Sequence, residues 1–227
     1  MALILSLETA TDNCSVALHD RGRLVASASH LESGAHSRML PLLMNQVMNQ
    51  TGVSFHELKA VAVSEGPGSY TGLRIGTSTA KGLAFSLDIK LLAIDTLKGL
   101  AHLARSQKPW FTIIAMLDAR RMEVYREIFD SEGKQIAGID SEILETDSFQ
   151  KYLKEGQVCF VGNANEKASQ VINSPNAYFL DSLPNASSIG ELAWENYQNE
   201  RFESIPYFTP NYLKEFRVLK SKKNPFA

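Results

Sequence analysis

The sequence predicts an α/β protein made of two α/β halves that pack around a cleft. Short apolar runs of strand length alternate with amphipathic stretches at helical spacing through its 227 residues. The first half predicts the order β-β-β-α-β-α-β-α, and strands begin again after a break at Gln107-Lys108-Pro109. With 44% hydrophobic and 21% charged residues, the chain can bury a core without disulfides or metals.

In the first half, three apolar runs predict antiparallel strands, and a turn containing Gly22 joins the second to the third. An apolar stripe at i, i+3, i+4, i+7 and i+8 predicts an amphipathic helix from Leu40. Ser37 is its expected N-cap and Gly52 its expected stop. The expected strands are 3–7, 14–18, 24–28, 61–64 and 91–94, and the expected helices are 40–51, 73–85 and 96–104.

The second half begins with a buried-type strand and continues with an alternating one, from Glu123 to Phe129, which is followed by a turn at Glu132-Gly133. Its expected strands are 112–117, 123–129, 135–145 and 158–161, and its last helix is 188–197. A boundary close to Gln107 separates an N-terminal subdomain, residues 1–106, from residues 107–227.

Composition limits the function classes. A net charge of −2 argues against a protein that grips RNA by itself. The one dense group of cations is C-terminal, and a solvated tail is favoured there over a contact with RNA or an acidic partner. This group is Lys214, Arg217, Lys220, Lys222 and Lys223. Cys14 and Cys159 lack metal-ligand spacing, which indicates buried thiols in a reducing compartment.

The N-terminal apolar run is a strand rather than a signal peptide, because it is short and has no basic residue before it. No segment approaches the about 18 apolar residues that a membrane span requires. We therefore expect a cytoplasmic protein with no membrane contact.

The glycine-rich loop, residues 65–74, has two equally supported interpretations. Free backbone N–H groups at a strand-to-helix turn can cradle phosphate, but the spacing matches no nucleotide-binding motif, and a tight structural turn explains it as well. In the helix that follows, Gly72, Gly76, Ala80 and Ala84 recur every four residues. This small-residue ridge permits close packing, either on the protein's own sheet or against a second subunit.

The stripe on the preceding helix is the other candidate contact surface. Methionine is favoured at recognition surfaces, although core packing is the commoner reason for such a stripe. Met39 widens the apolar arc beyond what one sheet needs to cover. The stripe consists of Leu40, Leu43, Met44, Val47 and Met48.

No catalytic constellation is recognisable. The five histidines are not paired at helical spacing, and there is neither a Cys/His cluster nor a GxSxG motif. Glu8, Asp12 and Asp118 are carboxylates near strand ends, where roles as caps or turn residues are favoured over binding of Mg–ATP. Neither a catalytic residue nor a metal site is therefore expected.

Several segments together resemble the TsaB (YeaZ) family. The most specific is GPGSYTGLRIGTSTAKGLA at residues 66–84. ETATDNCSVAL, HSRMLPLL, AIDTLKGLA, DARRMEVY and PNYLK are similar to the same family in the same order. The resemblance runs from Leu3 to about Tyr212 and is most specific over the first 125 residues.

This resemblance implies an actin-like, sugar-kinase-like (ASKHA) fold of two α/β subdomains, the second of them reduced. It also implies a non-catalytic scaffold subunit in tRNA threonylcarbamoyladenosine (t6A) modification. Such a subunit binds and activates the threonylcarbamoyltransferase TsaD together with the ATPase TsaE, forms a homodimer without TsaD, and reaches tRNA only through the complex. The positions matching the HxxxH metal ligands of TsaD are Thr96 and Leu100, so no cofactor is expected.

The family pairs through the two helices singled out above. The implied contact residues are Leu40, Leu43, Met44, Val47, Met48, Gly72, Gly76 and Ala80. Gly76→Trp is accordingly expected to abolish pairing without unfolding the monomer. The alternative is an enzyme of the same fold, either a degenerate ATP-binding protein or a glycoprotease-like peptidase. Its vestigial nucleotide site would comprise Glu8, Thr9, Thr11, Asn13, Gly66 and Gly68.

Overall fold

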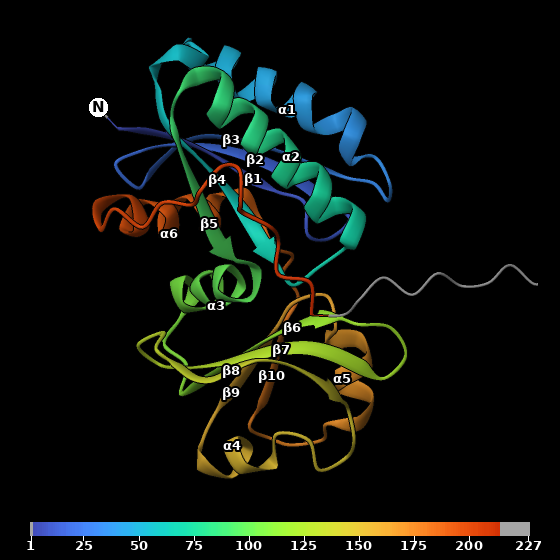
Figure 1. Ribbon diagram of the computed structural model, residues 1–227. Coiled ribbons are helices and arrows are strands. Elements are labelled where there is room, and N and C mark those ends of the chain that lie inside the picture. The colour runs from blue at the N-terminus through green and yellow to red at the C-terminus, as the bar shows by residue number, and fades with distance from the viewer. Residues whose placement is uncertain (1, 214–227) are drawn as a thin grey trace, which may run out of the picture.

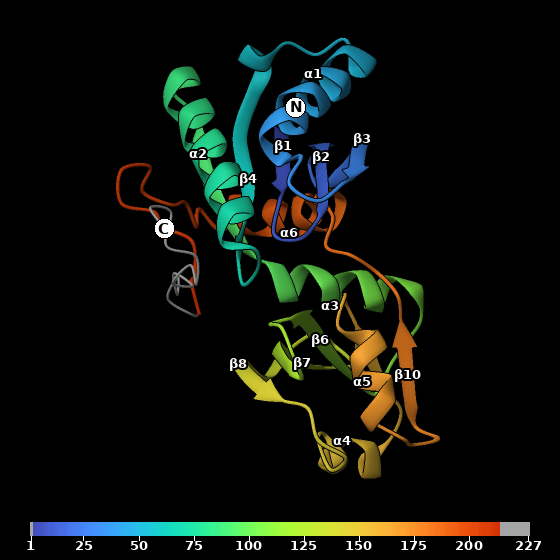
Figure 2. The ribbon, with the colours of Figure 1, turned by 90° about the vertical axis from the view of Figure 1, so that its right-hand side faces the viewer.

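The computed structural model describes residues 2–213, which form two lobes around two five-stranded sheets (Figure 1, Figure 2). The strand order is β3-β2-β1-β4-β5 in the first sheet and β10-β9-β6-β7-β8 in the second. The C-terminal cations Lys214, Arg217, Lys220, Lys222 and Lys223 lie outside the described residues. None of the helices within residues 2–213 is long and apolar enough to cross a membrane.

The first sheet is built around β1, which pairs antiparallel with β2 and parallel with β4. Every residue of β1 is buried, as expected for a central strand covered on both faces. The strands are β1 (Leu3–Glu8), β2 (Asn13–Asp20), β3 (Arg23–Leu31), β4 (Leu58–Gly66) and β5 (Lys90–Asp95).

Helices cover both faces of this sheet. Helices α1 (His36–Thr51) and α2 (Tyr70–Leu87) lie side by side on one face, and α6 (Ala186–Gln198) covers the other (Figure 1). Alternation along β1 divides the core accordingly, since Leu5 packs beneath α1 and α2 whereas Ile4 packs against α6.

The second lobe has the same layered plan on a smaller scale. Helix α3 (Thr96–Gln107) lies between the lobes and packs on one face of the second sheet, while α4 and α5 lie against the other. The strands are β6 (Thr112–Asp118), β7 (Glu123–Asp130), β8 (Gln135–Ile143), β9 (Val158–Val161) and β10 (Ala177–Leu180). The helices are α4 (Gln150–Glu155) and α5 (Asn165–Val171).

The chain returns to the first lobe after β10, which corrects the expected assignment of all residues 107–227 to the second subdomain. Helix α6 packs on the first sheet, and the segment after it, residues 203–213, runs past β5 and α2. We call this segment the C-terminal strap. The amphipathic pattern of α6 predicted its apolar face correctly but contains no information on which of two sheets that face covers.

The strap is held by backbone hydrogen bonds and by one buried side chain. The N–H of Glu203 donates to the Leu91 carbonyl at 2.8 Å, and the N–H of Asn211 donates to the Glu65 carbonyl at 2.7 Å. Phe208 is buried in the core beneath α1 and α2. Because these contacts span most of its length, the strap is an integral part of the first lobe.

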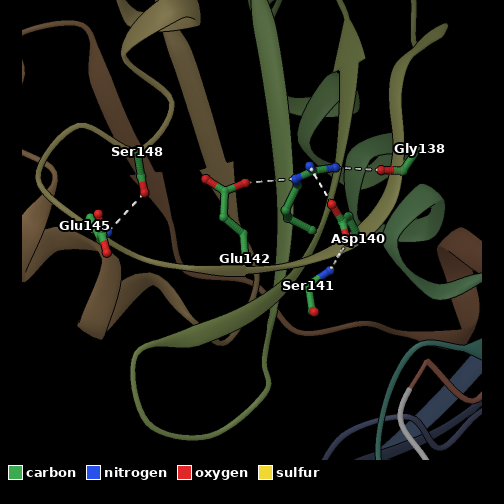
Figure 3. A network of polar contacts seen from close by, with 7 residues as sticks. Gly138, Asp140, Ser141, Glu142, Glu145 and Ser148 are labelled. Atoms are coloured by element: carbon green, nitrogen blue, oxygen red, sulfur yellow. Dashed lines mark hydrogen bonds and ion pairs between the residues drawn. The ribbon is translucent and has the colours of Figure 1, made fainter.

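Arg126 on β7 fixes the edge strand β8 where the register between the two strands shifts. Its guanidinium donates to the Gly138 carbonyl at 2.7 Å, to Glu142 at 3.0 Å and to Asp140 at 3.3 Å (Figure 3). Each of these groups lies on β8. The contacts of Arg126 therefore have a structural explanation, since its guanidinium is fully engaged by groups of β8.

Two helix ends differ in how well the sequence predicted them. Gly52 is the C-cap of α1 with φ of 68°, which confirms the predicted stop. Ser37 is not the N-cap, because α1 begins at His36 after Ala35 and has no side-chain cap. The ring of His36 instead bonds the Thr11 carbonyl at 2.7 Å, and this contact fixes the start of the helix.

Two neighbouring leucines on α1 should differ sharply in their contribution to stability. Leu43 is 3% exposed and Leu42 is 55% exposed. We predict that Leu43→Ala lowers the free energy of unfolding by about 2–5 kcal/mol, whereas Leu42→Ala changes it by less than about 0.5 kcal/mol. Urea titrations of the two variants measure this, and equal effects would contradict the observed orientation of α1.

Candidate functional site

The apolar stripe on α1 faces the protein's own sheet. All five of its side chains are at most 8% exposed and belong to the core that includes Leu5 and Leu7 of β1. They are Leu40, Leu43, Met44, Val47 and Met48. The expectation that they lie open to a second subunit is wrong, because β2 and β3 extend the sheet far enough beneath α1 to cover the whole arc. Pairing through the two helices stays a prediction.

The small-residue ridge on α2 also faces inward. A Cβ atom on Gly72 would collide with the carbonyl oxygen of Thr9, and one on Gly76 would collide with the Thr9 hydroxyl. Ala80, one turn further on, is fully buried. Of the two interpretations of the ridge, close packing within the chain is therefore the correct one. Gly76→Trp would unfold the monomer, so it cannot serve as a test of pairing.

The expected nucleotide-site residues do come together at the carboxyl ends of β1 and β4. Glu8, Thr9, Thr11 and Asn13 belong to the end of β1, the β1–β2 turn and the start of β2. On the facing segment, Gly66 ends β4 and Gly68 lies in the β4–α2 loop. The two segments are joined by a hydrogen bond from the Ser69 N–H to the Ala10 carbonyl at 2.7 Å. A Cβ atom on Gly68 would meet Ala10 at 2.6 Å. The space where a phosphate would need free N–H groups is therefore filled by the chain itself.

Glu8 is sealed at the base of this contact. Its side chain is 0% exposed, and its Oε1 accepts the Ala10 N–H at 2.6 Å and the Ser64 hydroxyl at 2.9 Å. Its Oε2 has no hydrogen-bond partner within residues 2–213. Burial raises the pKa of Glu8 from an ordinary 4.5 to about 7, and the backbone of Ala10, the Ser64 hydroxyl and the backbone of Thr9 lower it only in part. A carboxyl group in this state is unsuited to holding a metal–nucleotide complex.

Two more buried carboxyl groups face each other between the lobes. Asp95 caps α3 by accepting the Leu97 N–H at 2.7 Å, and Glu127 on β7 accepts the side-chain amide of Gln135. Burial raises the pKa of Glu127 to about 8 and that of Asp95 to about 6. Burial therefore keeps the pKa of both groups raised, and the charge of Asp95 adds to the rise at Glu127.

No metal site accompanies these carboxyl groups in the part of the chain that the structure describes. Residues 2–213 contain no group of three or more His, Cys, Asp or Glu side chains that could hold an ion. Thr96 and Leu100, the positions matching the metal ligands of TsaD, are both fully buried in α3.

An open groove of about 1260 Å³ lies between the lobes, beside the closed contact around Glu8. The β1–β2 turn and the N-terminus of α2 form one wall, and the β6–β7 turn forms the other. The end of the C-terminal strap lies at the rim, where the Tyr212 ring packs on Tyr70 at 4.8 Å. The groove is therefore a junction of four segments that are distant in sequence.

The β6–β7 turn carries two arginines in the left-handed region, Arg120 with φ of 73° and Arg121 with φ of 50°. Such backbone is uncommon outside glycine and persists where the surroundings hold it. Asp118 accepts the Arg120 N–H at 2.6 Å and the ammonium of Lys167 at 2.7 Å. Lys167 also donates to the Arg121 carbonyl at 3.0 Å, so the turn is braced from α5.

Sequence reasoning assigned no role to these two arginines, although they belong to the DARRMEVY segment. Adjacent arginines between two strand patterns do mark an exposed turn. Their left-handed backbone could not be predicted, since the residues that usually indicate it are glycine, asparagine and aspartate.

Comparison with known proteins identifies the class to which this architecture belongs. The family model described as "TsaD: tRNA N6-adenosine threonylcarbamoyltransferase" matches residues 30–218. The solved component A of (R)-2-hydroxyglutaryl-CoA dehydratase from Acidaminococcus fermentans is 10% identical and superposes with a TM-score of 0.51, covering 88% of this chain and 100% of its own. It shares the fold alone. The predicted two-lobed, actin-like or sugar-kinase-like α/β fold is confirmed.

More similar proteins identify the family within this class. The "tRNA threonylcarbamoyladenosine biosynthesis protein TsaB" of Haemophilus influenzae is 30% identical over 226 residues, which cover 93% of each chain. The solved YeaZ from Pseudomonas aeruginosa superposes with a TM-score of 0.83 at 26% identity, covering 94% of this chain and 100% of its own. The chain belongs to the TsaB (YeaZ) family of tRNA threonylcarbamoyladenosine biosynthesis proteins.

Substitution of Glu8 should flatten the pH dependence of stability. Because its folded pKa is raised, the folded protein keeps a proton that the unfolded chain releases. This contribution is complete below about pH 4.5 and is lost as pH rises through about 7. At about 1.4 kcal/mol per pKa unit the loss approaches about 3 kcal/mol, which Glu8→Gln should not suffer.

Urea unfolding of both proteins at about pH 5 and about pH 8 measures this difference. Glu65, Asp95 and Glu127 have raised pKa values as well, but they remain in both proteins and cancel in the comparison. If the free energies of unfolding of the two proteins differ by the same amount at both pH values, Glu8 is ionised in the folded state.

Proposed function

We propose that this protein is a non-catalytic scaffold subunit of t6A modification, which binds and activates TsaD and provides part of the docking surface for TsaE. Its membership of the TsaB family and the match of residues 30–218 to the TsaD model support a place beside that enzyme. The observation that carries the pairing is the outward surface of α1 and α2.

This surface is unusually poor in charge. Two helices of 16 and 18 residues contain only three Lys, Arg, Asp or Glu side chains, namely Arg38, Arg74 and Lys81. About a quarter of the residues in an average soluble protein are charged. Depletion of charge is the compositional mark of the buried core of a protein interface.

The three charges are also engaged within the chain. Arg38 pairs with Glu32 at 2.9 Å, and Arg74 donates to the Tyr70 hydroxyl at 3.0 Å. Lys81 donates to the carbonyl groups of Pro206 and Phe208 in the strap, at 3.2 and 3.1 Å. A partner that binds this surface would therefore remove water from few charged groups.

Apart from Arg38 and Arg74, the residues that α1 and α2 expose are small, apolar or uncharged polar. We define the outer face as Leu42, Asn45, Gln46, Ser78, Gly82 and Phe85, all of which are exposed. Phe85 is 80% exposed, which is costly for a side chain of its size in water. In the absence of TsaD, the same face binds a second copy of the chain, and a stable pair requires more than about 1,000 Å² of buried surface.

We assign the chain no chemistry of its own. Glu8 is buried, and the β1–β2 turn fills the space beside the glycine-rich loop. These contacts favour neither the degenerate ATP-binding enzyme nor the glycoprotease-like peptidase. The scaffold hypothesis needs neither activity.

Gly82→Arg should abolish pairing and leave the monomer folded. A Cβ atom at Gly82 meets nothing within 4 Å, and replacing a glycine inside a helix gains about 1 kcal/mol of helix propensity. An arginine in the middle of the outer face should weaken the complex with TsaD at least about tenfold in Kd. Co-elution with TsaD and light scattering of the chain alone measure both forms of pairing.

Ile143→Arg is the matched control, because Ile143 is 64% exposed on β8 in the other lobe. Its complexes should be those of the unmodified protein. If Gly82→Arg still co-elutes with TsaD at full occupancy, the outer face is not the interface.

The isolated chain should not bind Mg–ATP in the micromolar range. The phosphate position is closed by the hydrogen bond from Ser69 to Ala10, and opening it would expose the buried Glu8. Calorimetric titration with Mg–ATP should give no heat of binding beyond dilution. Tight binding accompanied by turnover would restore the enzyme hypothesis.

A further inference from the structure

Two aromatic side chains on the first lobe lie almost entirely in solvent. Tyr207 of the C-terminal strap is 84% exposed and Phe85 of α2 is 80% exposed, the two highest values among the large apolar side chains of residues 2–213. The next is Leu31 at 66%. A single exposed apolar residue is ordinary in a soluble protein. Two such rings on one part of the surface, from segments distant in sequence, require an explanation.

Lys81 places the two rings on the same part of the surface. Its ammonium donates to the carbonyl groups of Pro206 and Phe208, at 3.2 and 3.1 Å, and so holds the strap on both sides of Tyr207. Phe85 lies one turn further along the same helix, and residues four apart on a helix are neighbours on its surface. The strap therefore lies beside the part of α2 that carries Phe85 (Figure 2).

The backbone of the strap holds Tyr207 in a fixed position. Its neighbour Phe208 is 6% exposed and packs into the core beneath α1 and α2, together with the partly buried Ile205. The N–H groups of Tyr207 and Phe208 both donate to the Ser204 carbonyl, at 3.1 and 2.8 Å, which closes a turn of the backbone. A ring on an ordered turn loses little conformational entropy when a partner covers it.

The chemistry of the two rings fits a protein partner. Phe85 belongs to the charge-poor outer face, and Tyr207 adds a phenol whose ring can be covered while its hydroxyl stays in water. Tyrosine and phenylalanine are enriched in protein interfaces. A nucleic acid or an anionic membrane would need a free cation beside the rings, but the ammonium of Lys81 is bonded to the strap. The rings therefore extend the outer face beyond α1 and α2.

The proposed function supplies the partner, TsaD. Residues 30–218 of this chain match the TsaD family model, and this span includes the whole strap. A surface by which a chain binds its own copy can also bind a protein of the same family, because the two present equivalent elements. We propose that the strap is a third segment of the TsaD-binding surface, with Tyr207 and Phe85 as its aromatic anchors. This inference rests on the proposed pairing through the outer face and adds a segment outside the two helices.

The test is the affinity of the full chain for TsaD, measured by isothermal titration calorimetry. Tyr207→Ser and Phe85→Ser should each weaken binding at least about tenfold, because truncation of an aromatic anchor leaves its site on the partner unfilled. Tyr207→Phe should stay within about threefold, since it keeps the ring. Leu31→Ser is the matched control and should stay within about twofold, because Leu31 is exposed on β3, at the opposite edge of the sheet from the strap.

Urea unfolding separates a weaker interface from a weaker fold. The midpoints of both serine variants should match that of the unmodified chain, because the truncated rings are exposed in the free protein. A loss of affinity at an unchanged midpoint then reports on the interface.

Gly82→Arg separates this inference from the function on which it rests. If Gly82→Arg keeps its affinity for TsaD, the outer face is not the interface and the proposed pairing fails. If Gly82→Arg loses affinity while Tyr207→Ser binds as tightly as Leu31→Ser, the pairing stands and the strap lies outside the interface.

Two further results would overturn the inference. One is a Tyr207→Phe variant that binds TsaD as weakly as Tyr207→Ser, since the ring would then not be the anchor. The other is a Tyr207→Ser variant that loses self-association but keeps its affinity for TsaD, which would assign the strap to contact with a second copy.

Discussion

The absence of side chains at Gly72 and Gly76 is the constraint on which the rest of the first lobe depends. Without Cβ atoms there, the first turns of α2 rest directly on Thr9, whose hydroxyl donates to the Gly72 carbonyl at 2.8 Å. Glycine inside a helix costs about 1 kcal/mol relative to alanine, and here close contact with the β1–β2 turn offsets that cost. The contact fixes which side of α2 faces inward and therefore which residues face a partner.

The same contact decides the chemistry of the cleft. By drawing the β1–β2 turn against the glycine-rich loop, it encloses Glu8 and leaves one of its oxygens without a partner among the described residues. A carboxyl group kept protonated near neutral pH stabilises the fold more readily than it holds a metal ion. What stays open is the outer part of the groove, where Arg120 and the tyrosine rings lie. The contact of the β1–β2 turn with the glycine-rich loop thus explains both the closed base of the groove and its open rim.

Much of the fold could be predicted from the sequence because periodicity reports directly on burial. The stripe from Leu40 to Met48 and the order of helices and strands along the first lobe follow from it. Periodicity does not show which element covers a buried face. The width of the sheet beneath α1 was therefore underestimated, and α6 was assigned to the wrong lobe. Helix α5 and strand β10 were missed, since α5 has only seven residues and β10 lacks the continuous burial that made β9 recognisable. Arg120 and Arg121 were overlooked because their importance lies in backbone angles.

Helix α2 serves three surfaces at once, and this arrangement links the proposed pairing to the groove between the lobes. Its glycine face packs inward, its outer face holds Gly82, and its N-terminal turn lines the groove beside Tyr70. An 18-residue helix is about 27 Å long, so a subunit bound to the outer face lies within one helix length of the groove. Lys81 ties the strap to the same helix. A partner bound to the outer face is thereby placed at a fixed distance from the groove.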